Sequence, residues 1–298
     1  MWPPAGWVAR PAAASTATED RGGRIVAPPA VVLLNALAAR GRAGELRHPV
    51  ADWLARHAPG VPLLSAASVT EARARLSILA PRTRIALIGG DGTLHAMLPA
   101  LLKGGLRVGL VPAGQHNEVA CSLHLDQLDW RQALLHALHA PTAAVDIGLI
   151  ETDAAVLHFA GLVRIEAGQP LSLWIDQHRV ALPQPVRRLR LCNATPPPAD
   201  RDAPDRIAPV LIDDALLHLL DEPQRPLWQR LLHPAARPPA RPALRLRIEA
   251  AQPMPILIDG EPQPATRQIR AELLPGALQM TGSHVPTLDP HRLSDTTW

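Results

Sequence analysis

The chain has 298 residues, of which 47% are hydrophobic and only 3% aromatic, so one large or two modest domains can form around a core of aliphatic side chains. The 30 basic and 27 acidic residues give a net charge of +3, which is too weak to indicate nucleic-acid binding. Two cysteines, Cys121 and Cys192, exclude a disulfide framework and offer no metal-binding spacing. No apolar run reaches the roughly 18–20 residues that cross a bilayer, and the N-terminus lacks a signal-peptide pattern. We therefore expect a cytoplasmic protein.

Short apolar runs alternate with amphipathic segments in the first half of the chain. Residues 1–29 are rich in alanine, proline, glycine and arginine without any period, and we interpret them as a disordered leader. The expected strands lie at 31–34, 61–64, 83–88 and 106–111, and the expected helices at 48–57, 70–79, 94–102, 117–125 and 129–139. Such alternation predicts a parallel sheet covered by helices on both faces, in which ligands bind beyond the C-terminal strand ends.

The pattern changes near residue 145, beyond which short β-like runs are separated by clusters of proline. These runs lie at 155–163, 171–176, 187–192, 243–249, 255–258, 269–273 and 277–280. Many short strands with turn signals predict a mainly antiparallel β-sandwich. We therefore expect an α/β fold, in which a parallel α/β nucleotide-binding domain (30–145) precedes a β-sandwich domain (146–280) and a C-terminal tail (281–298).

The most informative stretch is Gly89-Gly90-Asp91-Gly92-Thr93, which follows the expected strand 83–88 and precedes a helix. Glycines let a ligand approach the backbone closely, and the free N–H groups at a helix start favour a phosphate. Asp91 and Thr93 add a carboxylate and a hydroxyl, which suit a nucleotide phosphate with its magnesium. A glycine-rich turn without a ligand would have the same spacing, so the spacing alone leaves phosphate binding open.

Three motifs, taken together, resemble those of a kinase family. Residues 89–93 resemble the GGDGT signature of the diacylglycerol kinase, sphingosine kinase and NAD kinase superfamily. Residues 111–120 resemble the P-x-G-T-x-N-D-x-A segment of the lipid kinases, and residues 256–261 resemble their late strand ending in DGE. The resemblance covers about 31–280. It implies a lipid kinase, similar to bacterial diacylglycerol kinases, that transfers the γ-phosphoryl group of ATP to a lipid hydroxyl such as that of diacylglycerol, with Mg²⁺ as a cofactor.

The resemblance also implies which residues contact the nucleotide. They follow strand ends in the first domain: Asn35, Ser65, Gly89, Gly90, Asp91, Gly92, Thr93, Gly114, Gln115, Asn117 and Glu118. Gln115 replaces the threonine of the family and Glu118 its usual aspartate. Asn35 is retained from an N-P-x-S-G turn whose proline, serine and glycine are lost.

Asp259 and Glu261 are the candidate proton acceptors, since the resemblance implies that one of this pair is the general base. They lie two residues apart at a strand end, so an extended chain would point both side chains to the same side. Asp91 is the third candidate for the catalytic machinery, where it would help to hold the metal-bound nucleotide. The pair Asp259-Gly260 is equally a strong hairpin-turn signal, and both interpretations can hold together. Which carboxylate is the base stays open, because a raised pKa depends on burial.

A structural magnesium site is implied farther along, because residues 212–217 resemble the D-D-G-x-L turn of bacterial family members. The ligands would be Asp214 and the backbone carbonyls of Leu211 and Leu216. The alternative is a solvated pair of acids before the next element.

The arginine-flanked segment 225–230 would allow contact with a membrane surface. The expected partner is thus a lipid substrate at the inner membrane face, with no nucleic acid, and a homodimer stays open.

Two other functions compete with the lipid kinase. The chain could be a non-catalytic descendant that binds a nucleotide or lipid. The lost N-P-x-S-G residues, Gln115, and a second domain that is shorter than in the family between Phe159 and Asn193 suggest this alternative. It could also be an NAD kinase-like enzyme, because Asn117-Glu118 is similar to the NE pair of that family. The retained Asp91, Asp259 and Glu261 argue against the first alternative, and the late DGE strand argues against the second.

Overall fold

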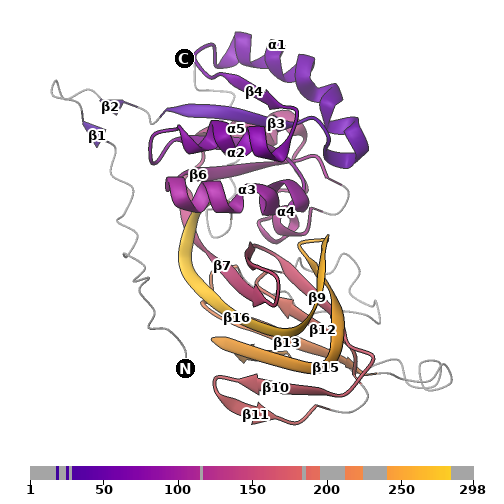
Figure 1. Ribbon diagram of the computed structural model, residues 1–298. Helices are drawn as coiled ribbons and strands as arrows, with labels where there is room; N and C mark the ends of the chain where they lie inside the picture. The colour runs from indigo at the N-terminus through magenta and orange to yellow at the C-terminus, as the bar shows by residue number, and fades with distance from the viewer. Residues whose placement is uncertain are drawn as a thin grey trace.

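The computed structural model describes residues 18–19, 25–26, 29–114, 117–182, 186–194, 212–223 and 240–282. A helix-covered α/β region and a strand-rich region lie end to end in this structure (Figure 1). Within the stretch 1–29, the described residues form one short antiparallel pair, β1 (Thr18–Glu19) with β2 (Ile25–Val26). The predicted roles of Gln115, Leu211 and the segment 225–230 fall outside the described residues.

Four parallel strands form the sheet of the α/β region, in the order β6-β5-β3-β4. They are β3 (Ala30–Asn35), β4 (Leu63–Ala66), β5 (Arg84–Gly89) and β6 (Arg107–Pro112). Every residue of β5 is buried, as expected for a central strand with both faces covered. The parallel sheet expected from the alternating pattern is confirmed.

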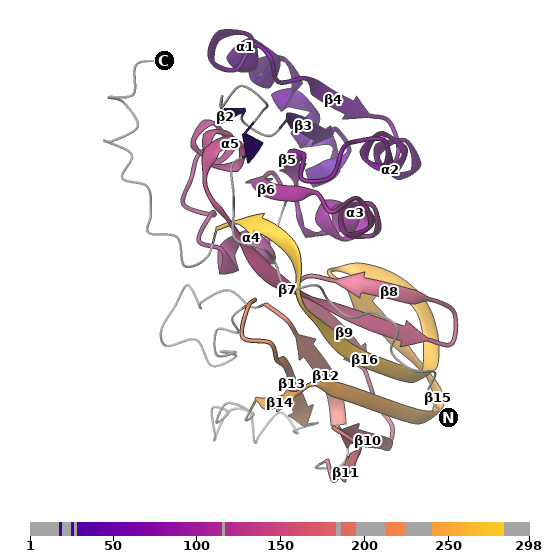
Figure 2. The same cartoon turned by 90° about the vertical axis from the view of Figure 1, so that its left-hand side faces the viewer.

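Helices cover both faces of this sheet (Figure 2). The helical elements are η1 (Ala38–Leu46), α1 (Arg47–His57), α2 (Val69–Ser77), α3 (Asp91–Gly104), α4 (Glu118–Ser122) and α5 (Trp130–His139). Helices α2 and α3 pack on the face that carries Leu33 and Leu87, whereas α1 and α5 pack on the face that carries Leu34 and Ile88. Alternate residues of one strand thus enter two different cores.

The strand-rich region contains mostly antiparallel neighbours, in the order β14-β13-β12-β9-β15-β16. Its strands are β7 (Thr142–Thr152), β8 (Val156–Phe159), β9 (Leu162–Glu166), β10 (Leu171–Ile175), β11 (His178–Val180), β12 (Val186–Cys192), β13 (Leu217–Pro223), β14 (Arg241–Ala243), β15 (Arg245–Ile258) and β16 (Glu261–Thr281). The strands curve around one apolar core, to which β9, β10, β12, β15 and β16 all contribute. The predicted mainly antiparallel region is therefore confirmed.

Two strands are longer than the sequence pattern predicted. The runs 243–249 and 255–258 form one strand, β15, with a register irregularity between Glu249 and Met254. The runs 269–273 and 277–280 form one strand, β16, with a shift between Leu274 and Leu278. A bulge interrupts the alternation of apolar side chains without ending the strand. The sequence pattern therefore predicted two short strands where the structure has one long strand.

Strand β16 joins the two regions. It pairs with β7 along most of its length, and its end pairs in parallel with β6 through Gln279 and Met280. The sheet therefore continues from the antiparallel strands into the parallel ones, and residue 145 lies inside β7. This continuity fixes the C-terminal ends of β3 and β5 opposite the hairpin between β15 and β16.

Candidate active site

A cleft of about 870 Å³ lies between the two regions. One wall consists of the C-terminal end of β3, the start of α3 and the turn after β6, and the other consists of β9 and the β15–β16 hairpin. The cleft therefore lies beyond the C-terminal ends of the parallel strands, as predicted for a sheet of this kind. Its volume suits a small organic ligand or a cofactor.

The glycine turn brings two backbone segments into direct contact. A Cβ added to Gly90 would lie 2.8 Å from the Cα of Gly114, and a Cβ added to Gly114 would lie 2.6 Å from the Cα of Gly90. Helix α3 starts after Gly90 without a side-chain cap. The N–H groups of Thr93 and Leu94 donate to the Gly90 carbonyl, which leaves those of Asp91 and Gly92 for an anionic ligand that the helix dipole favours.

Amide side chains hold the shape of these turns. Asn35 donates a hydrogen bond from Nδ2 to Thr93 Oγ1 over 2.8 Å, which connects β3 to α3. Asn117 has a left-handed φ of 50°. Its Oδ1 accepts from the Gly114 N–H (2.9 Å) and its Nδ2 donates to the Gly114 carbonyl (3.0 Å). Both asparagines line the cleft, and their hydrogen bonds position the turns that border it.

Asp91 connects the two turns. Its carboxylate accepts the backbone N–H groups of Glu118 (2.7 Å) and Val119 (3.1 Å) at the start of α4. Burial raises the pKa of Asp91 to about 6, against the effect of these two hydrogen bonds, and the nearby charges of Asp259 and Glu118 raise it further. Asp91 thus has a structural role at the bottom of the cleft, which its carboxylate also lines.

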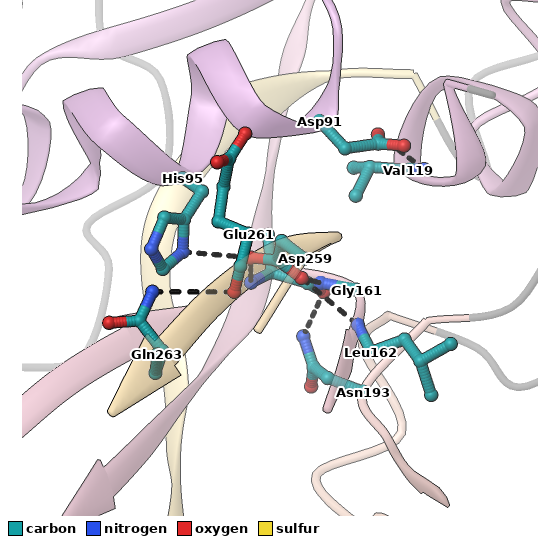
Figure 3. A network of polar contacts seen from close by, with 10 residues as sticks. Asp91, His95, Val119, Gly161, Leu162, Asn193, Asp259, Glu261 and Gln263 are labelled. Atoms are coloured by element: carbon teal, nitrogen blue, oxygen red, sulfur yellow. Dashed lines mark hydrogen bonds and ion pairs between the residues drawn. The ribbon is translucent and has the colours of Figure 1, made fainter. Parts of the chain in front are cut away.

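The hairpin between β15 and β16 corrects one expectation and confirms another. Asp259 and Gly260 form the two-residue turn, with φ of 47° and 84°, and Ile258 pairs with Glu261, so the hairpin interpretation is confirmed. The expected extended geometry is wrong, because the left-handed turn separates the two carboxylates. The carboxylate of Glu261 points toward α3 and comes into contact with Gly92 (Figure 3).

The carboxylate of Asp259 is turned the other way and is almost fully buried (Figure 3). It accepts three backbone N–H groups, from Ala160 and Gly161 at 2.9 Å and from Leu162 at 3.0 Å. Its Oδ2 also lies 3.4 Å from His95 Nδ1. Asp259 therefore organises the turn between β8 and β9 as well as facing the cleft.

His95 is a candidate residue that the sequence analysis missed. It lies on α3, one helical turn after Asp91, so both side chains share the face of the helix that borders the cleft. Its Nδ1 is buried and lies 3.4 Å from Asp259 Oδ2, a contact that does not meet hydrogen-bond geometry, and it has no hydrogen-bond partner within the described part of the chain. His158 is close by, since burial and the charge of His95 both lower the pKa of His158. The four-residue spacing of Asp91 and His95 was the available signal.

Residues 29–150 match the family model of the diacylglycerol kinase catalytic domain. This part of the chain is therefore similar to that catalytic domain. The match spans the glycine turn and α3 and ends inside β7. The predicted resemblance to the diacylglycerol kinase family is confirmed over this range, which contains the motifs at 89–93 and 111–120 but not the one at 256–261.

The whole fold is similar to a crystal structure of a diacylglycerol kinase from Bacillus anthracis str. Sterne, with a TM-score of 0.66 and 17% sequence identity. The similarity covers 86% of this chain and 97% of that chain. Two further solved structures of proteins named as diacylglycerol kinases from the same organism give the same score and identity, and 97% and 99% of those chains are covered. No curated protein matches the sequence.

The predicted nucleotide contacts of the diacylglycerol kinase catalytic domain divide into two sets. Those that line the cleft are Asn35, Gly90, Asp91, Gly92, Thr93, Gly114, Asn117 and Glu118. Gly89 and Ser65 do not line it, and Ser68 is the serine that does. The Ser68 hydroxyl accepts the Glu71 N–H and caps α2, so its position follows from the helix start.

The predicted magnesium ligand Asp214 lies outside the cleft lining. Its Oδ1 accepts the Leu216 N–H (3.0 Å) and its Oδ2 lies 2.8 Å from His218 Nε2. Burial and then repulsion by Asp214 and Asp213 raise the pKa of the neighbouring Asp146, a charge arrangement that a cation would stabilise. Among the described residues, however, no three acid, histidine or cysteine side chains are arranged to hold a metal ion. The magnesium site at Asp214 stays a prediction.

Within the described part of the chain, no helix has both the length and the apolar character to span a bilayer.

Proposed function

We propose that this protein is an ATP-dependent kinase that transfers the γ-phosphoryl group to a lipid hydroxyl, such as that of diacylglycerol. The observation that carries the proposal is the cleft itself. It brings the uncapped start of α3 and its glycine turn opposite the hairpin with Asp259 and Glu261. Phosphoryl transfer depends on positioning and on charge stabilisation, and it needs a proton acceptor for the attacking hydroxyl.

The two walls support separate parts of this reaction. On the α3 side, the first-turn N–H groups would hold the phosphates of ATP. Asp91 and Glu118 are carboxylates on that wall that would hold Mg²⁺, and the ion would neutralise phosphate charge when it is bound with the nucleotide. On the hairpin side, the lipid hydroxyl oxygen would bond to the γ-phosphorus while the bond from phosphorus to the ADP oxygen breaks. A group of the hairpin wall would receive the hydroxyl proton.

Glu261 is the carboxylate best placed to meet the nucleotide, because its side chain lies against Gly92 in the first turn of α3. Asp259 is already committed to three backbone N–H groups and lies beside His95. We therefore assign the direct contact with the reacting groups to Glu261. We assign a positioning role to Asp259, which holds the hairpin against the turn between β8 and β9.

The test is transfer of radiolabel from [γ-³²P]ATP, with Mg²⁺, to a panel of lipids: diacylglycerol, monoacylglycerol, sphingosine, ceramide and phosphatidylglycerol. We expect labelled lipid with the wild type and a loss of roughly 100-fold or more in Glu261→Gln and Asp259→Asn. Glu249→Gln is the matched control, because Glu249 lies on β15 and pairs with Arg247 outside the cleft lining.

Two results would contradict the proposal. ATP binding without labelling of any lipid would indicate a non-catalytic descendant of the family. Label transferred to NAD, and to none of the lipids, would indicate an NAD kinase-like enzyme.

A further inference from the structure

The hairpin wall of the cleft carries one arginine, Arg164 on β9. Its Nε is buried and has no hydrogen-bond partner among the described residues. The other arginines that line the cleft, Arg40 and Arg73, come from η1 and α2 on the opposite wall, and Arg73 donates to the Ala96 carbonyl. A buried guanidinium nitrogen without a hydrogen-bond partner lowers the stability of the folded protein. The described contacts therefore do not explain why an arginine occupies position 164.

The strand register makes this position more unusual. Arg164 lies directly opposite Arg190 on β12, and like charges in directly opposed cross-strand positions are destabilising. On its other side, Arg164 lies opposite Leu257 on β15, so neither directly opposed residue is an acid. The contrast is with Arg188, which forms an ion pair with Glu166 over 2.7 Å between the same two strands.

Arg164 lies close to the β15–β16 hairpin along the strands. Leu162, two residues before Arg164, donates its N–H to Asp259, and Leu257, opposite Arg164, lies two residues before Asp259. Two residues of strand span about 7 Å. The backbone of Arg164 therefore lies about two strand residues from the hairpin turn at Asp259, on the wall where the lipid would bind.

We propose that Arg164 binds an anionic group of the lipid acceptor, so that the preferred substrate is a phospholipid with a free hydroxyl in its headgroup. This inference rests on the proposed kinase function and names the substrate class for it. A planar guanidinium fits two phosphate oxygens at once, which gives both affinity and orientation. The phosphate at Arg164 would then direct the headgroup hydroxyl toward the hairpin, and a neutral diacylglycerol would lack this contact.

The first experiment measures binding by calorimetry without nucleotide. It compares dihexanoyl phosphatidylglycerol with dihexanoylglycerol, each below its micelle concentration and at fixed ionic strength. We expect the wild type to bind the anionic lipid more tightly, and Arg164→Gln to weaken that binding by roughly 10–100-fold without affecting the neutral lipid. Arg164→Lys, which keeps the charge but not the two-pronged geometry, should lose less.

Arg188→Gln is the matched control, because it removes an arginine from the adjacent strand while its side chain lies outside the cleft lining. We expect it to bind phosphatidylglycerol as the wild type does. An equal loss in Arg188→Gln would reveal only a diffuse charge effect and would overturn the proposal. Unchanged binding in Arg164→Gln, or an equal loss for both lipids, would overturn it as well. The melting temperature of each variant verifies folding, and Arg164→Lys decides the question if Arg164→Gln does not fold.

A second experiment separates a lipid phosphate from a nucleotide phosphate. ATP affinity of Arg164→Gln should equal that of the wild type, and a selective loss of ATP binding would assign Arg164 to the nucleotide and overturn the proposal. In the transfer assay, Arg164→Gln should lower the ratio of kcat/KM for the anionic lipid to kcat/KM for the neutral lipid.

The two proposals fail in different ways. If the wild type phosphorylates lipids and this ratio does not change in Arg164→Gln, the substrate class is wrong and the kinase function stands. If neither lipid is phosphorylated but phosphatidylglycerol binding depends on Arg164, the kinase function is wrong and the anionic site stands.

Discussion

His95 Nδ1 and Asp259 Oδ2 lie 3.4 Å apart and connect the two walls of the cleft. The side chains are 13% and 1% exposed, so the contact lies away from bulk water. Because Asp259 also accepts the N–H groups of residues 160–162, a single carboxylate connects α3, the β15–β16 hairpin and the start of β9 (Figure 3). The orientation of the His95 imidazole in the cleft therefore depends on the hairpin.

Replacement of His95 should affect transfer more than nucleotide binding. We expect His95→Ala to lower kcat of lipid phosphorylation by roughly 100-fold, because the imidazole lies against Asp259 on the wall that would receive the hydroxyl proton. ATP affinity should change little, since His95 lies one helical turn beyond Asp91. Steady-state kinetics with calorimetry of ATP binding would measure both effects. His158→Ala is the control, because His158 lies close to His95 but outside the cleft lining. Unchanged kcat in His95→Ala would contradict a role in the reaction.

The contact between Gly90 and Gly114 predicts a strict requirement for glycine. In Gly90→Ala the new methyl group would lie 2.8 Å from the Gly114 Cα, so the backbone of one turn must move. We expect a loss of about 1–3 kcal/mol in unfolding free energy and a weaker affinity for ATP, because the α3 N–H groups move with the turn. Gly60→Ala is the control, since a Cβ there meets nothing within 4 Å. Urea unfolding and ATP titration check the prediction, which normal ATP binding by Gly90→Ala would contradict.

The sequence was sufficient for the α3 wall because its signals are local. Buried runs such as 84–89, followed by glycines and a helix start, predict where the C-terminal strand ends lie, and parallel strands place those ends together. The hairpin wall was not predictable in the same way. Asp259 binds N–H groups about a hundred residues earlier, and its left-handed φ turns its side chain away from Glu261.

Long-range register explains the other omission. Arg164 stands out only because its cross-strand neighbours are Arg190 and Leu257. These neighbours lie on strands that the fold brings together. Its sequence neighbourhood, an arginine among alternating apolar residues, is that of any exposed strand position.

The raised pKa of Asp91 predicts a particular pH dependence of stability. Its pKa is about 6 in the folded protein and 3.8 in the reference state, so the folded state holds the proton more tightly. The associated stabilisation is fully present below pH 3.8 and is lost as the pH rises through 6. We expect the unfolding free energy of wild type minus that of Asp91→Asn to fall by about 2 kcal/mol between pH 4.5 and 7.5.

Urea titrations of both proteins at several pH values, without nucleotide or metal, measure this difference. Asp153→Asn serves as the control of opposite sign, because hydrogen bonds from Arg267 and Thr266 lower the pKa of Asp153. Its contribution is present above its unfolded pKa and is lost only as the pH falls. A difference between wild type and Asp91→Asn that stays flat, or rises with pH, would be inconsistent with burial as the dominant effect on the Asp91 carboxylate.

Arg84 offers a stability test that is independent of the cleft. Its Nη1 donates to the carbonyls of Ala137 (3.3 Å) and Ala140 (2.7 Å) at the C-terminus of α5, where a cation also complements the helix dipole. Arg84→Met would leave buried carbonyls without donors, so we expect a loss of about 2–4 kcal/mol in unfolding free energy and unchanged ATP affinity. Arg107 lies opposite Arg84 on β6, and after burial its charge is the next factor that lowers the pKa of Arg84. Arg107→Met should therefore be neutral or stabilising in the same urea titration, and an equal loss in both variants would refute the helix-capping role.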